Sequence, residues 1–582
     1  MESKYKNQIV KIGNVKIGRD NPVLIQSMTN TNTIDTIETV EQIIRIVDAG
    51  ANIVRISTPT IKDAENLKDI KEHLLQKGYN IPLVADIHFN PKIAKIAAKI
   101  VDKIRINPGN FVDKKKEYTT EFLPPQYQEE LEKIKKQFIP LLQICKQHNT
   151  AIRIGVNHGS LSERIINKYG DTPVGMVESA MEYIQICKDE DFHNIVLSLK
   201  SSNTRVMVYA NRLLFEKMKQ TGIVYPLHIG VTEAGFGEDG RLKSAVGIGA
   251  LLSDGIGNTI RVSLTEAPEN EIPVAELILE YSDNYKSSDT KKSATEFIKR
   301  KTNSVGKIGG NNKFSVITKS RSELVPNNHS TDDFVYLDTN TDDLYPMFDF
   351  NDFLLASVKS DILNFVDIWV SKFSQKHIDT LKELNNVALI LSSYGYDDIN
   401  DYYNSFELIE QNNLQTPVVI KRTYFEEQIE NLQIDCAAEL GGLLIDGYGE
   451  GLWLETEEDF PQSKINKLAY GLLQASRVRF SKPEYISCPT CSRTLFDIEK
   501  ICKEIKERTS NIKNIKIGIM GCIVNGPGEM ADADYGYVGS GIGKISLYKG
   551  KEVIKKNIPE NNAINELIEL IKANGDWKTT EN

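Results

Sequence analysis

The residues with the plainest chemistry lie near the end of the chain, where three cysteines and a glutamate have spacings typical of a metal centre. Cys488 and Cys491 form a Cys-Pro-Thr-Cys pair, and Cys522 and Glu529 follow in the segment MGCIVNGPGEM. A Cys-x-x-Cys pair brings two thiolates within reach of one centre, and a thiolate from a distant strand end can close it. The Gly-Pro-Gly turn after Cys522 would return Glu529 towards it. The set predicts three thiolate ligands and one carboxylate ligand.

Two kinds of centre fit this spacing, an iron-sulfur cluster and a structural zinc ion. Cys-x-x-Cys with one further cysteine is also part of zinc-ribbon patterns, but no suitable fourth Cys or His occurs near Cys522. The other cysteines, Cys145, Cys187, Cys436 and Cys502, lie singly in apolar runs and are expected to be buried thiols. Radical chemistry with S-adenosylmethionine is disfavoured, since the chain has no Cys-x-x-x-Cys-x-x-Cys run.

A second group of candidate residues is a set of cations in short strand-like runs. Four runs, VRIS, IRIN, IRIG and IRVS, place an arginine between apolar residues and before a small or polar one, and LSLKSSN places a lysine similarly. Because side chains alternate faces along a strand, each cation shares a face with a polar residue two or four positions later. The predicted pairs are Arg55 with Ser57, Arg105 with Asn107, Arg153 with Asn157, Lys200 with Ser202 and Arg261 with Ser263.

These cations indicate an anionic substrate if they converge. Any single arginine could instead face outward and pair with a helix carboxylate. Several guanidinium groups at one place repel one another, and their planar donors suit bidentate phosphate binding. The set therefore favours a phosphorylated, in particular a diphosphorylated, small molecule. Asp86 and His88 at the end of LVADIHFN, and Glu233 in HIGVTEAG, could transfer protons, although a lone histidine on a strand is more often structural.

A parallel barrel would bring these residues together. Eight short β-branched runs alternate with helical segments from residue 24 to about residue 283, which is typical of parallel strands with crossover helices. Eight such units predict an α/β fold of the (β/α)8, or TIM barrel, type, with its chemistry at the carboxyl ends of the strands. The runs centre on residues 24–28, 52–57, 82–88, 103–107, 151–156, 194–199, 225–230 and 259–263.

Composition restricts the class of protein. A chain of 582 residues exceeds what one core usually supports, and 40% hydrophobic with 26% charged residues is typical of a globular protein. The formal charge of -10 argues against a broadly basic nucleic-acid-binding surface. Neither a signal peptide nor a membrane-spanning apolar run is evident, and seven cysteines are too few for a disulfide scaffold. We therefore expect a cytoplasmic protein.

Both ends of the chain resemble the family of 4-hydroxy-3-methylbut-2-enyl diphosphate synthases (the IspG/GcpE family). The motifs that carry the resemblance are QSMTNT, RINPGN, RIGVNHGSL, VTEAG, IRVSL, CPTCSR and GCIVNGPGE, of which the last two are the most specific. The resemblance implies an oxidoreductase with a [4Fe-4S] cluster. It would open the ring of 2-C-methyl-D-erythritol 2,4-cyclodiphosphate reductively, with loss of water, in the methylerythritol phosphate route to isoprenoids.

The resemblance also implies residue roles and partners. Ferredoxin or flavodoxin would deliver two electrons. In the family's short form the cluster domain of one subunit closes over its partner's barrel, so a homodimer is a candidate assembly. The cluster ligands would be Cys488, Cys491, Cys522 and Glu529; the substrate-binding residues Arg55, Arg105, Asn107, Arg153, Asn157, Lys200, Arg261 and Ser263; and the catalytic residues Glu233, Glu529, Asp86 and His88.

The chain departs from the short form by a long insert. The polar run YKSSDTKKSATEF ends the barrel, and the strand-like runs FVYLD, DIWVS, VALILSS, PVVIKR and GLLIDG predict a second α/β domain with a structural role. This organisation resembles the long, plant-like variant, whose insert is described as a degenerate barrel. We expect a barrel over 1–283, the insert over 284–475 and an α+β iron-sulfur domain over 476–582. The competing interpretation is a phosphate-binding barrel with a structural-zinc interaction module, which leaves Glu529 unexplained.

Overall fold

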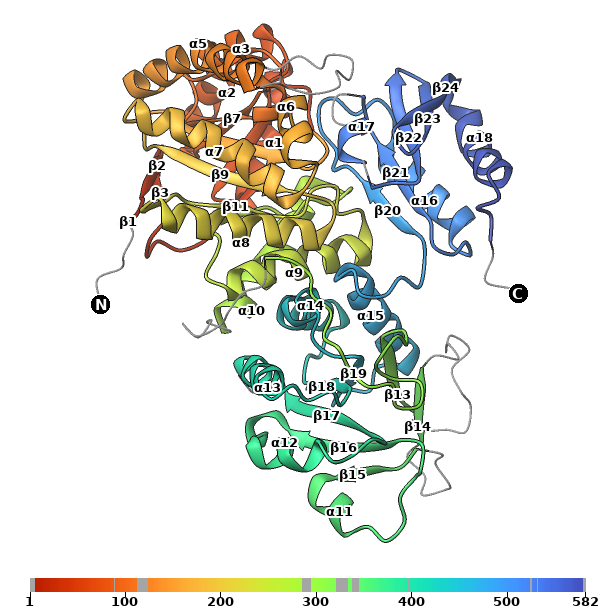
Figure 1. Ribbon diagram of the computed structural model, residues 1–582. Helices are drawn as coiled ribbons and strands as arrows, with labels where there is room; N and C mark the ends of the chain where they lie inside the picture. Colours follow the sequence, from red (N-terminus) through yellow and green to blue (C-terminus); the bar gives the residue numbers. More distant parts are fainter. Residues whose placement is uncertain are drawn as a thin grey trace. The chain divides into compact units, whose positions relative to one another are not determined.

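The chain forms two compact units, Met1–Leu279 with Lys482–Asn582, and Glu280–Ser481 (Figure 1). The structure is a computed structural model that describes residues 6–87, 89–112, 124–284, 295–320, 333–337, 345–395, 398–523, 526–530 and 532–578. No helix within these ranges is both long enough and apolar enough to cross a membrane. The division into three domains at residues 283 and 475 stays a prediction.

The first unit contains the predicted barrel. Its strands pair in parallel in the order β11-β12-β4-β5-β6-β7-β8-β9. A parallel bridge between Leu197 and Leu227 links the two ends of this sheet, which confirms the TIM-barrel architecture. The strands are β4 (Leu24–Met28), β5 (Ile53–Ser57), β6 (Leu83–Asp86), β7 (Lys103–Ile106), β8 (Ala151–Asn157), β9 (Ile195–Lys200), β11 (His228–Ile229) and β12 (Thr259–Ile260).

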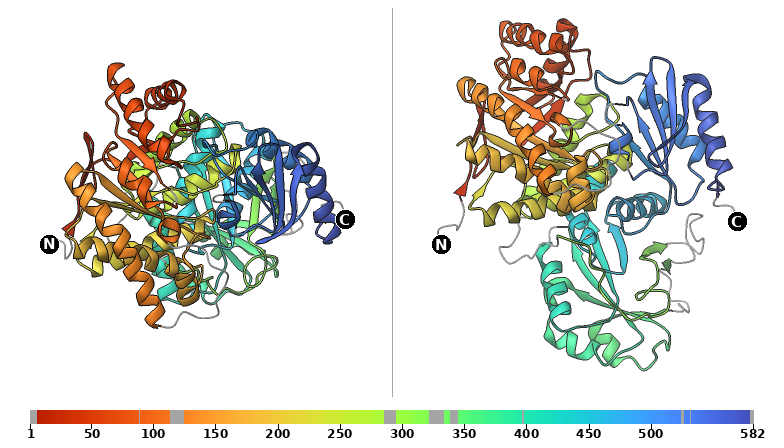
Figure 2. Two further views of the ribbon diagram at one scale, coloured as in Figure 1. Left: turned by 90° about the horizontal axis from the view of Figure 1, so that it is seen from above. Right: turned by 45° about the horizontal axis from the view of Figure 1, so that its top comes forward.

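Helices follow the barrel strands and surround them (Figure 2). Several begin at a side chain that accepts a backbone N–H of the first turn, as do Asp35, Thr60, Thr172 and Asn203, and such caps satisfy donors that the helix itself leaves free. The helices are α1 (Thr36–Asp48), α2 (Ile61–Gln76), α3 (Pro91–Ala97), α4 (Pro108–Phe111), α5 (Pro124–His148), α6 (Glu163–Tyr169), α7 (Pro173–Asp189), α8 (Thr204–Gln220), α9 (Gly237–Ser253) and α10 (Glu271–Asn284).

A hairpin closes the amino-terminal end of the barrel. Strands β2 (Val10–Ile12) and β3 (Val15–Ile17) pair in antiparallel fashion around a turn in which Gly13 has a φ of 55°. A side chain is strained at such a φ, so glycine suits this position. Strand β1 (Lys6–Asn7) pairs with β10 (Ile223–Val224). The buried hairpin residues form one apolar cluster with the first inward residues of the strands: Val10, Ile12, Ile17, Ile53, Val84, Ala151 and Val196.

The C-terminal part of the first unit has the predicted α+β organisation. Its sheet has the order β20-β21-β22-β23-β24, with parallel pairs in the first three strands and antiparallel pairs in the last three. Residues of α16 (Ile498–Thr509) and α18 (Glu560–Ala573) share one apolar cluster with the sheet, so both helices cover the same face. The remaining elements are β20 (Glu484–Ser487), β21 (Lys516–Met520), α17 (Gly526–Glu529), β22 (Tyr535–Gly541), β23 (Lys544–Lys549) and β24 (Glu552–Pro559).

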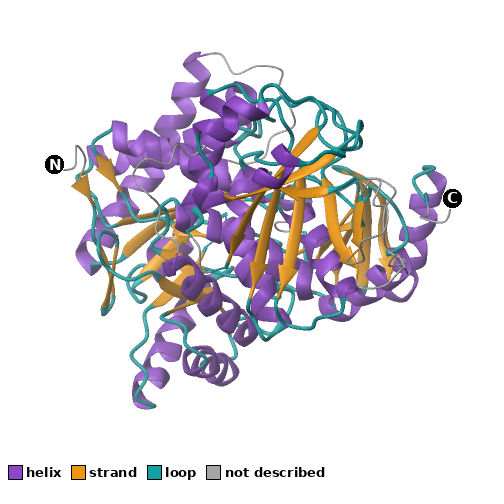
Figure 3. Ribbon diagram, turned by 90° about the horizontal axis from the view of Figure 1, so that it is seen from below, coloured by secondary structure: helices purple, strands orange, loops and turns teal. Residues whose placement is uncertain are grey.

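The second unit is a parallel α/β sheet, as predicted for the insert. Its order is β14-β13-β19-β18-β17-β16-β15, and each pair is parallel. In the described residues β14 and β15 are edges, so the sheet is open. Strands lie side by side and helices lie against them throughout the molecule (Figure 3). The strands are β13 (Ser315–Ser320), β14 (Phe334–Leu337), β15 (Met347–Asp349), β16 (Asn364–Trp369), β17 (Val387–Tyr394), β18 (Val418–Tyr424) and β19 (Gly451–Thr456).

The prediction of one strand in the insert is wrong. The run GLLIDG, residues 442–447, begins within α14 (Ile429–Ile445) instead of forming a strand. This helix is buried on nearly all sides, so it lacks the polar stripe that marks a surface helix and its end resembles a buried strand. The other predicted runs overlap β14, β16, β17 and β18, whereas β13, β15 and β19 were not predicted. The remaining helices are α11 (Phe350–Leu355), α12 (Gln375–Leu381), α13 (Asn400–Gln411) and α15 (Gln462–Ala475).

Because the hairpin forms part of the barrel core, we predict that Ile12→Ala lowers the free energy of unfolding by about 2–5 kcal/mol, the usual cost of truncating a buried isoleucine. Ile12 is fully buried, whereas Ile9 is 41% exposed, so Ile9→Ala is the matched control. Urea unfolding followed by circular dichroism measures both. Equal stabilities of the two variants would mean that the hairpin adds nothing to the barrel core.

Candidate functional site

One pocket of the first unit joins the carboxyl ends of the barrel strands to loops of the C-terminal sheet. Six cations and two carboxylates line it together with three cysteines. Strand-end residues and loop residues far apart in the sequence therefore share one cavity. Of the predicted site residues it contains Arg55, Asp86, Arg105, Arg153, Asn157, Lys200, Glu233, Arg261, Ser263, Cys488, Cys491 and Cys522.

Three predicted site residues are not among those that line the pocket. Asn107 is buried beside α4, where its Oδ1 accepts the Gly109 N–H and its Nδ2 donates to Ser160. It therefore acts as a helix cap. His88 lies outside the described residues. The backbone of Glu529 ends α17, but its side chain also lies outside the description.

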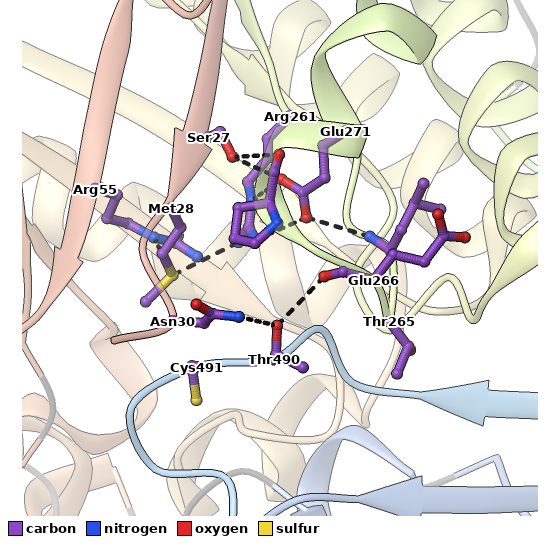
Figure 4. A network of polar contacts seen from close by, with 12 residues as sticks. Ser27, Met28, Asn30, Arg55, Arg261, Thr265, Glu266, Glu271, Thr490 and Cys491 are labelled. Carbon is purple, nitrogen blue, oxygen red and sulfur yellow. Dashed lines mark hydrogen bonds and ion pairs between the residues drawn. The ribbon is translucent and has the colours of Figure 1, made fainter. Parts of the chain in front are cut away.

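The cysteine loop is attached to the barrel by polar contacts. Asn30, just after β4, donates to Thr490 Oγ1 over 2.8 Å, beside Cys491 (Figure 4). The Thr265 hydroxyl lies 2.7 Å from that of Ser487 and 3.1 Å from the Cys488 carbonyl oxygen. These contacts fix both sides of the loop. One chain thus supplies both the barrel cations and the thiols of this site.

Ion pairs strengthen the same attachment further from the pocket. Lys243 on α9 and Glu484 on β20 are both buried, and Lys243 Nζ lies 2.8 Å from Glu484 Oε1. Asp239, also on α9, accepts hydrogen bonds from the ammonium groups of Lys482 and Lys506. Burial raises the pKa of Asp239, but these two cations outweigh burial and lower the pKa to about 2. The C-terminal sheet is therefore held against the barrel by groups other than those of the pocket.

Arg261 and Arg105 of the pocket are hydrogen-bonded to carboxylates. Arg261 donates from Nε and Nη2 to the two oxygens of Glu271, at 3.2 and 3.1 Å, and Ser27 also donates to Glu271 (Figure 4). Arg105 donates to Asp86 Oδ1 over 3.2 Å and to the Gly155 carbonyl oxygen over 3.0 Å. Both guanidinium groups are therefore held in fixed orientations.

Arg153 has donors left over. Its Nη1 donates to Ser198 over 2.7 Å, but Nε and Nη2, which form one edge of the guanidinium, are buried without a hydrogen-bond partner in the described structure. Burial, together with the charges of Arg55 and Arg105, lowers the pKa of Arg153. A buried donor that lacks a partner is costly, so this edge favours an anion with two adjacent oxygens.

Arg55 and Lys200 add charge to the same place. Arg55 Nε lies 3.0 Å from Met28 Sδ (Figure 4), and its pKa is lowered to about 10, chiefly by burial and against the opposing effect of Asp86. Burial also lowers the pKa of Lys200, and Arg153 and Arg55 lower it further. Both shifts show that the charged forms are disfavoured here, and an anion bound beside them would raise both pKa values.

Close packing of two arginines depends on a glycine. A Cβ on Gly155 would lie 2.7 Å from Arg105 Nε and 3.3 Å from Arg153 Nη1. A side chain at this position of β8 would displace the arginines. The glycine in the run IRIG thus has a steric role that the strand pattern alone does not reveal.

Beneath the mouth lies a buried polar layer. Lys103 is fully buried, its Nζ donates to Gln26 over 3.1 Å, and burial followed by the charges of Arg153 and Arg55 lowers its pKa well below the usual 10.5. His228 Nδ1 lies 2.8 Å from Thr259 Oγ1, and burial and the nearby Lys200 lower its pKa. Titratable nitrogen groups therefore continue from the mouth into the barrel, where burial disfavours their charged forms.

Glu233 is the second carboxylate of the pocket. It is 3% exposed and has a φ of 46°, which is unusual for a residue other than glycine. Such backbone strain often accompanies functional positions, because the surrounding structure must enforce it. Its position in the pocket next to Thr232 makes it a proton-transfer candidate.

The three cysteines come from the ends of neighbouring parallel strands. Cys488 and Cys491 follow β20, and Cys522 follows β21, which explains how a thiol distant in sequence joins the pair. Cys488 Sγ lies 3.2 Å from the Gly521 backbone nitrogen, which donates to it, and burial followed by neighbouring Cys491 raises the pKa of Cys488. Among the described residues no three His, Cys, Asp or Glu side chains lie close enough to hold one metal ion.

The sequence analysis missed Arg493 and Glu271. Arg493 follows Cys491 by two positions, lines the pocket, and places Nη2 at 3.9 Å from Asp86 Oδ2. Burial lowers its pKa, but Cys491, Asp86 and Cys522 outweigh this and raise it. This arginine belongs to the motif CPTCSR, and its position two residues after a predicted cluster ligand could have indicated that it lies in the site. Cys145, Cys187, Cys436 and Cys502 are buried, as predicted.

Comparisons with known proteins match the whole chain. Residues 7–276 match the family model described as the GcpE TIM-barrel domain, and residues 484–573 match the GcpE protein C-terminal domain. The chain is 48% identical over 610 residues to the 4-hydroxy-3-methylbut-2-en-1-yl diphosphate synthase (flavodoxin) of Phocaeicola vulgatus, covering 99% of this chain and 98% of that protein. It is 46% identical over 610 residues to the protein of the same name from Bacteroides fragilis, covering 99% and 97%.

Folding lowers the pKa of Lys103 below 10.5. Between the folded pKa and 10.5 the unfolded chain therefore binds more protons than the folded chain does. Because of this difference, the free energy of unfolding rises with pH within that window. Lys103→Met removes this dependence. Its stability relative to the unmodified protein should therefore fall by about 1.4 kcal/mol per pH unit within that window.

Urea unfolding from about pH 8 to about pH 10 measures the slope. Ile9→Ala removes no charge and serves as the control, whose stability difference should stay constant with pH. A flat difference for Lys103→Met would show that Lys103 keeps its ordinary pKa in the folded protein.

Proposed function

Because the chain belongs to the GcpE family of 4-hydroxy-3-methylbut-2-en-1-yl diphosphate synthases, we propose that it converts 2-C-methyl-D-erythritol 2,4-cyclodiphosphate to 4-hydroxy-3-methylbut-2-enyl diphosphate. The reaction opens the ring reductively with two electrons and releases water. The observation that carries the proposal is one pocket that joins six cations to three thiols within a single chain. The cations would bind a diphosphate, and the thiols would hold a redox centre.

The barrel mouth is the proposed diphosphate site. The pocket has more cations than carboxylates, and the unused Nε and Nη2 of Arg153 offer a bidentate edge to phosphate oxygens. Arg105 and Arg261 are oriented by Asp86 and Glu271, so both guanidinium groups would meet the substrate in fixed directions. Burial excludes water and strengthens each of these contacts. The proposed set also includes Arg55, Asn157, Lys200 and Ser263, and Asn107 indirectly through α4.

The three thiols fit the [4Fe-4S] cluster implied by the family. Cys488, Cys491, Cys522 and Glu529 would hold it, and the N–H of Gly521 aimed at Cys488 is the kind of donor that stabilises a thiolate ligand. When bound, the cluster supplies the two electrons to the substrate. Glu233, buried in the same pocket, is proposed to hold a proton for the leaving oxygen. Roles for Asp86 and His88 in proton transfer stay predictions.

Flavodoxin is the proposed electron donor, because the similar proteins named above carry it in their names. We propose a cytoplasmic location, which suits thiol ligands that must stay reduced. The insert is proposed to be structural. A homodimer stays a prediction, and the site itself needs no second chain, since this chain supplies both the cations and the thiols.

An anaerobic turnover assay tests the function directly. Purified protein with an artificial reductant should convert the cyclic diphosphate, and it should contain iron, acid-labile sulfide and a broad visible absorbance. A colourless protein that contains zinc and does not turn over would support the phosphate-binding barrel with a zinc module instead.

We predict that Arg153→Leu weakens substrate binding by about 1.5–3 kcal/mol, or roughly 10–150-fold in Kd, because it removes charge-assisted hydrogen bonds in a buried site. The cluster spectrum should not change. Titration calorimetry with oxidised holoenzyme measures the affinity. Arg508→Leu, on the exposed face of α16, is the matched control, and equal affinities would remove Arg153 from the diphosphate site.

We predict that Glu233→Gln lowers the single-turnover rate of reduced enzyme by about 10²–10⁴-fold, the usual effect of losing a proton-transfer group. Substrate affinity should change little, since the amide keeps the size of the carboxylate. Rapid-quench measurements give the rate, and Glu216→Gln at an exposed position is the control. An unchanged rate would exclude Glu233 as the proton donor.

A further inference from the structure

Arg493 is a cation that the C-terminal domain extends into the barrel mouth. It lies between Cys491 and α16, yet its side chain is only 13% exposed and lines the same pocket as the barrel cations. Five of the six pocket cations come from strand ends, and Arg493 is the sixth. A buried arginine among like charges is unfavourable unless an anion offsets them.

The donors of Arg493 are only partly used. Its Nη2 lies 3.9 Å from Asp86 Oδ2, close enough for an ion pair but too far for a good hydrogen bond. Its Nε and Nη1 are buried without a hydrogen-bond partner in the described structure. The Cys491 side chain is also close to this guanidinium, so a bound oxygen-rich anion would meet the N–H groups that remain.

Asp86 connects this arginine to the barrel. Its Oδ1 accepts from Arg105 over 3.2 Å, while its Oδ2 faces Arg493. One carboxylate therefore lies between an arginine of the barrel and an arginine of the cysteine loop. Asp86 is 2% exposed, so its charge acts on both at low dielectric.

The loop that carries Arg493 is held in place by hydrogen bonds that do not involve Arg493. Asn30 donates to Thr490 (Figure 4), and Thr265 donates to the Cys488 carbonyl oxygen. Within the loop, Thr494 Oγ1 accepts the Cys491 N–H over 3.1 Å. Arg493 is therefore presented to the pocket from an ordered turn rather than from a free surface segment.

We propose that Arg493 contacts the diphosphate of the substrate and that Asp86 is the positioning residue that holds it ready. The phosphate oxygens would take the hydrogen bonds that Nε and Nη1 lack. The diphosphate site is then bipartite, with its sixth cation on the cysteine loop. Substrate binding and the ordering of that loop are consequently linked, since each favours the other. This inference rests on the proposed function.

Titration calorimetry with oxidised holoenzyme and the cyclic diphosphate tests the contact. Arg493→Gln should raise Kd about 10–150-fold, and Arg493→Lys, which keeps the charge but loses the planar donors, should raise it several-fold. Asp86→Asn should weaken binding strongly in the unmodified protein and less in the Arg493→Gln background. Arg508→Gln is the control, and iron content is matched among all variants before they are compared.

Hydrogen exchange of residues 488–496 tests the linkage and does not depend on turnover. Saturating substrate should slow exchange in the unmodified protein and slow it much less in Arg493→Gln. A merely structural role for Arg493 would alter exchange without substrate and leave Kd unchanged.

Three results would overturn the proposal. If the unmodified protein does not bind the cyclic diphosphate, the proposed function itself fails. If it binds and Arg493→Gln binds equally with equal loop protection, only the role of Arg493 fails. Should Arg493→Gln lose its iron, Arg493→Lys takes its place, and an unchanged Kd in that variant is equally decisive.

Discussion

Buried positive charge at the mouth of the barrel is the constraint on which the rest of the structure depends. Arginines and lysines that leave water must be offset by carboxylates, by oriented dipoles or by an anion. The chain uses few carboxylates for this purpose: Glu271 pairs with Arg261, and Asp86 pairs with Arg105. It leaves Arg153 with an unused edge. The site is therefore incomplete electrostatically, and the proposed diphosphate would complete it.

The two carboxylates also set geometry. Glu271 begins α10 and takes hydrogen bonds from Arg261, Ser27 and the Leu264 backbone, so the last helix of the barrel unit is joined to the mouth. Asp86 lies between the barrel and the cysteine loop. Removing either would release an arginine into a cavity that already has an excess of positive charge. The acidic residues thus order the basic ones.

The sequence predicted the parts of the fold that depend on local periodicity. Strand alternation placed Arg55, Arg105, Arg153 and Arg261 at strand ends on one face, and parallel topology then brought them together. Asn107 shows where this reasoning stops, because it shares the face of Arg105 but is followed by Pro108, a signal for a helix cap. The end of α14 was predicted as a strand because this buried helix has no polar stripe in its sequence.

Residues positioned by packing between distant segments could not be predicted from pattern. Glu271 reaches Arg261 only because α10 packs where it does, and Arg493 reaches Asp86 only because β20 and β21 dock beside the barrel. Neither contact has a period or a spacing that one sequence reveals, although the motif CPTCSR places Arg493 beside a predicted ligand. The side chains of His88 and Glu529 lie outside the described residues, so their predicted roles rest on the sequence pattern and on the resemblance.

The bridge between Ala234 and Ser487 joins segments on either side of the whole insert. The barrel is complete in sequence at α10, but the loops that cover its mouth begin only after Ser481. At about 5–20 residues per second, a ribosome needs roughly 10–40 s to make the intervening segment of about 200 residues. A barrel that folds during that interval would have its charged mouth open to solvent. The order of synthesis thus leaves a period in which the cavity can acquire counter-ions before its thiol-bearing cover exists.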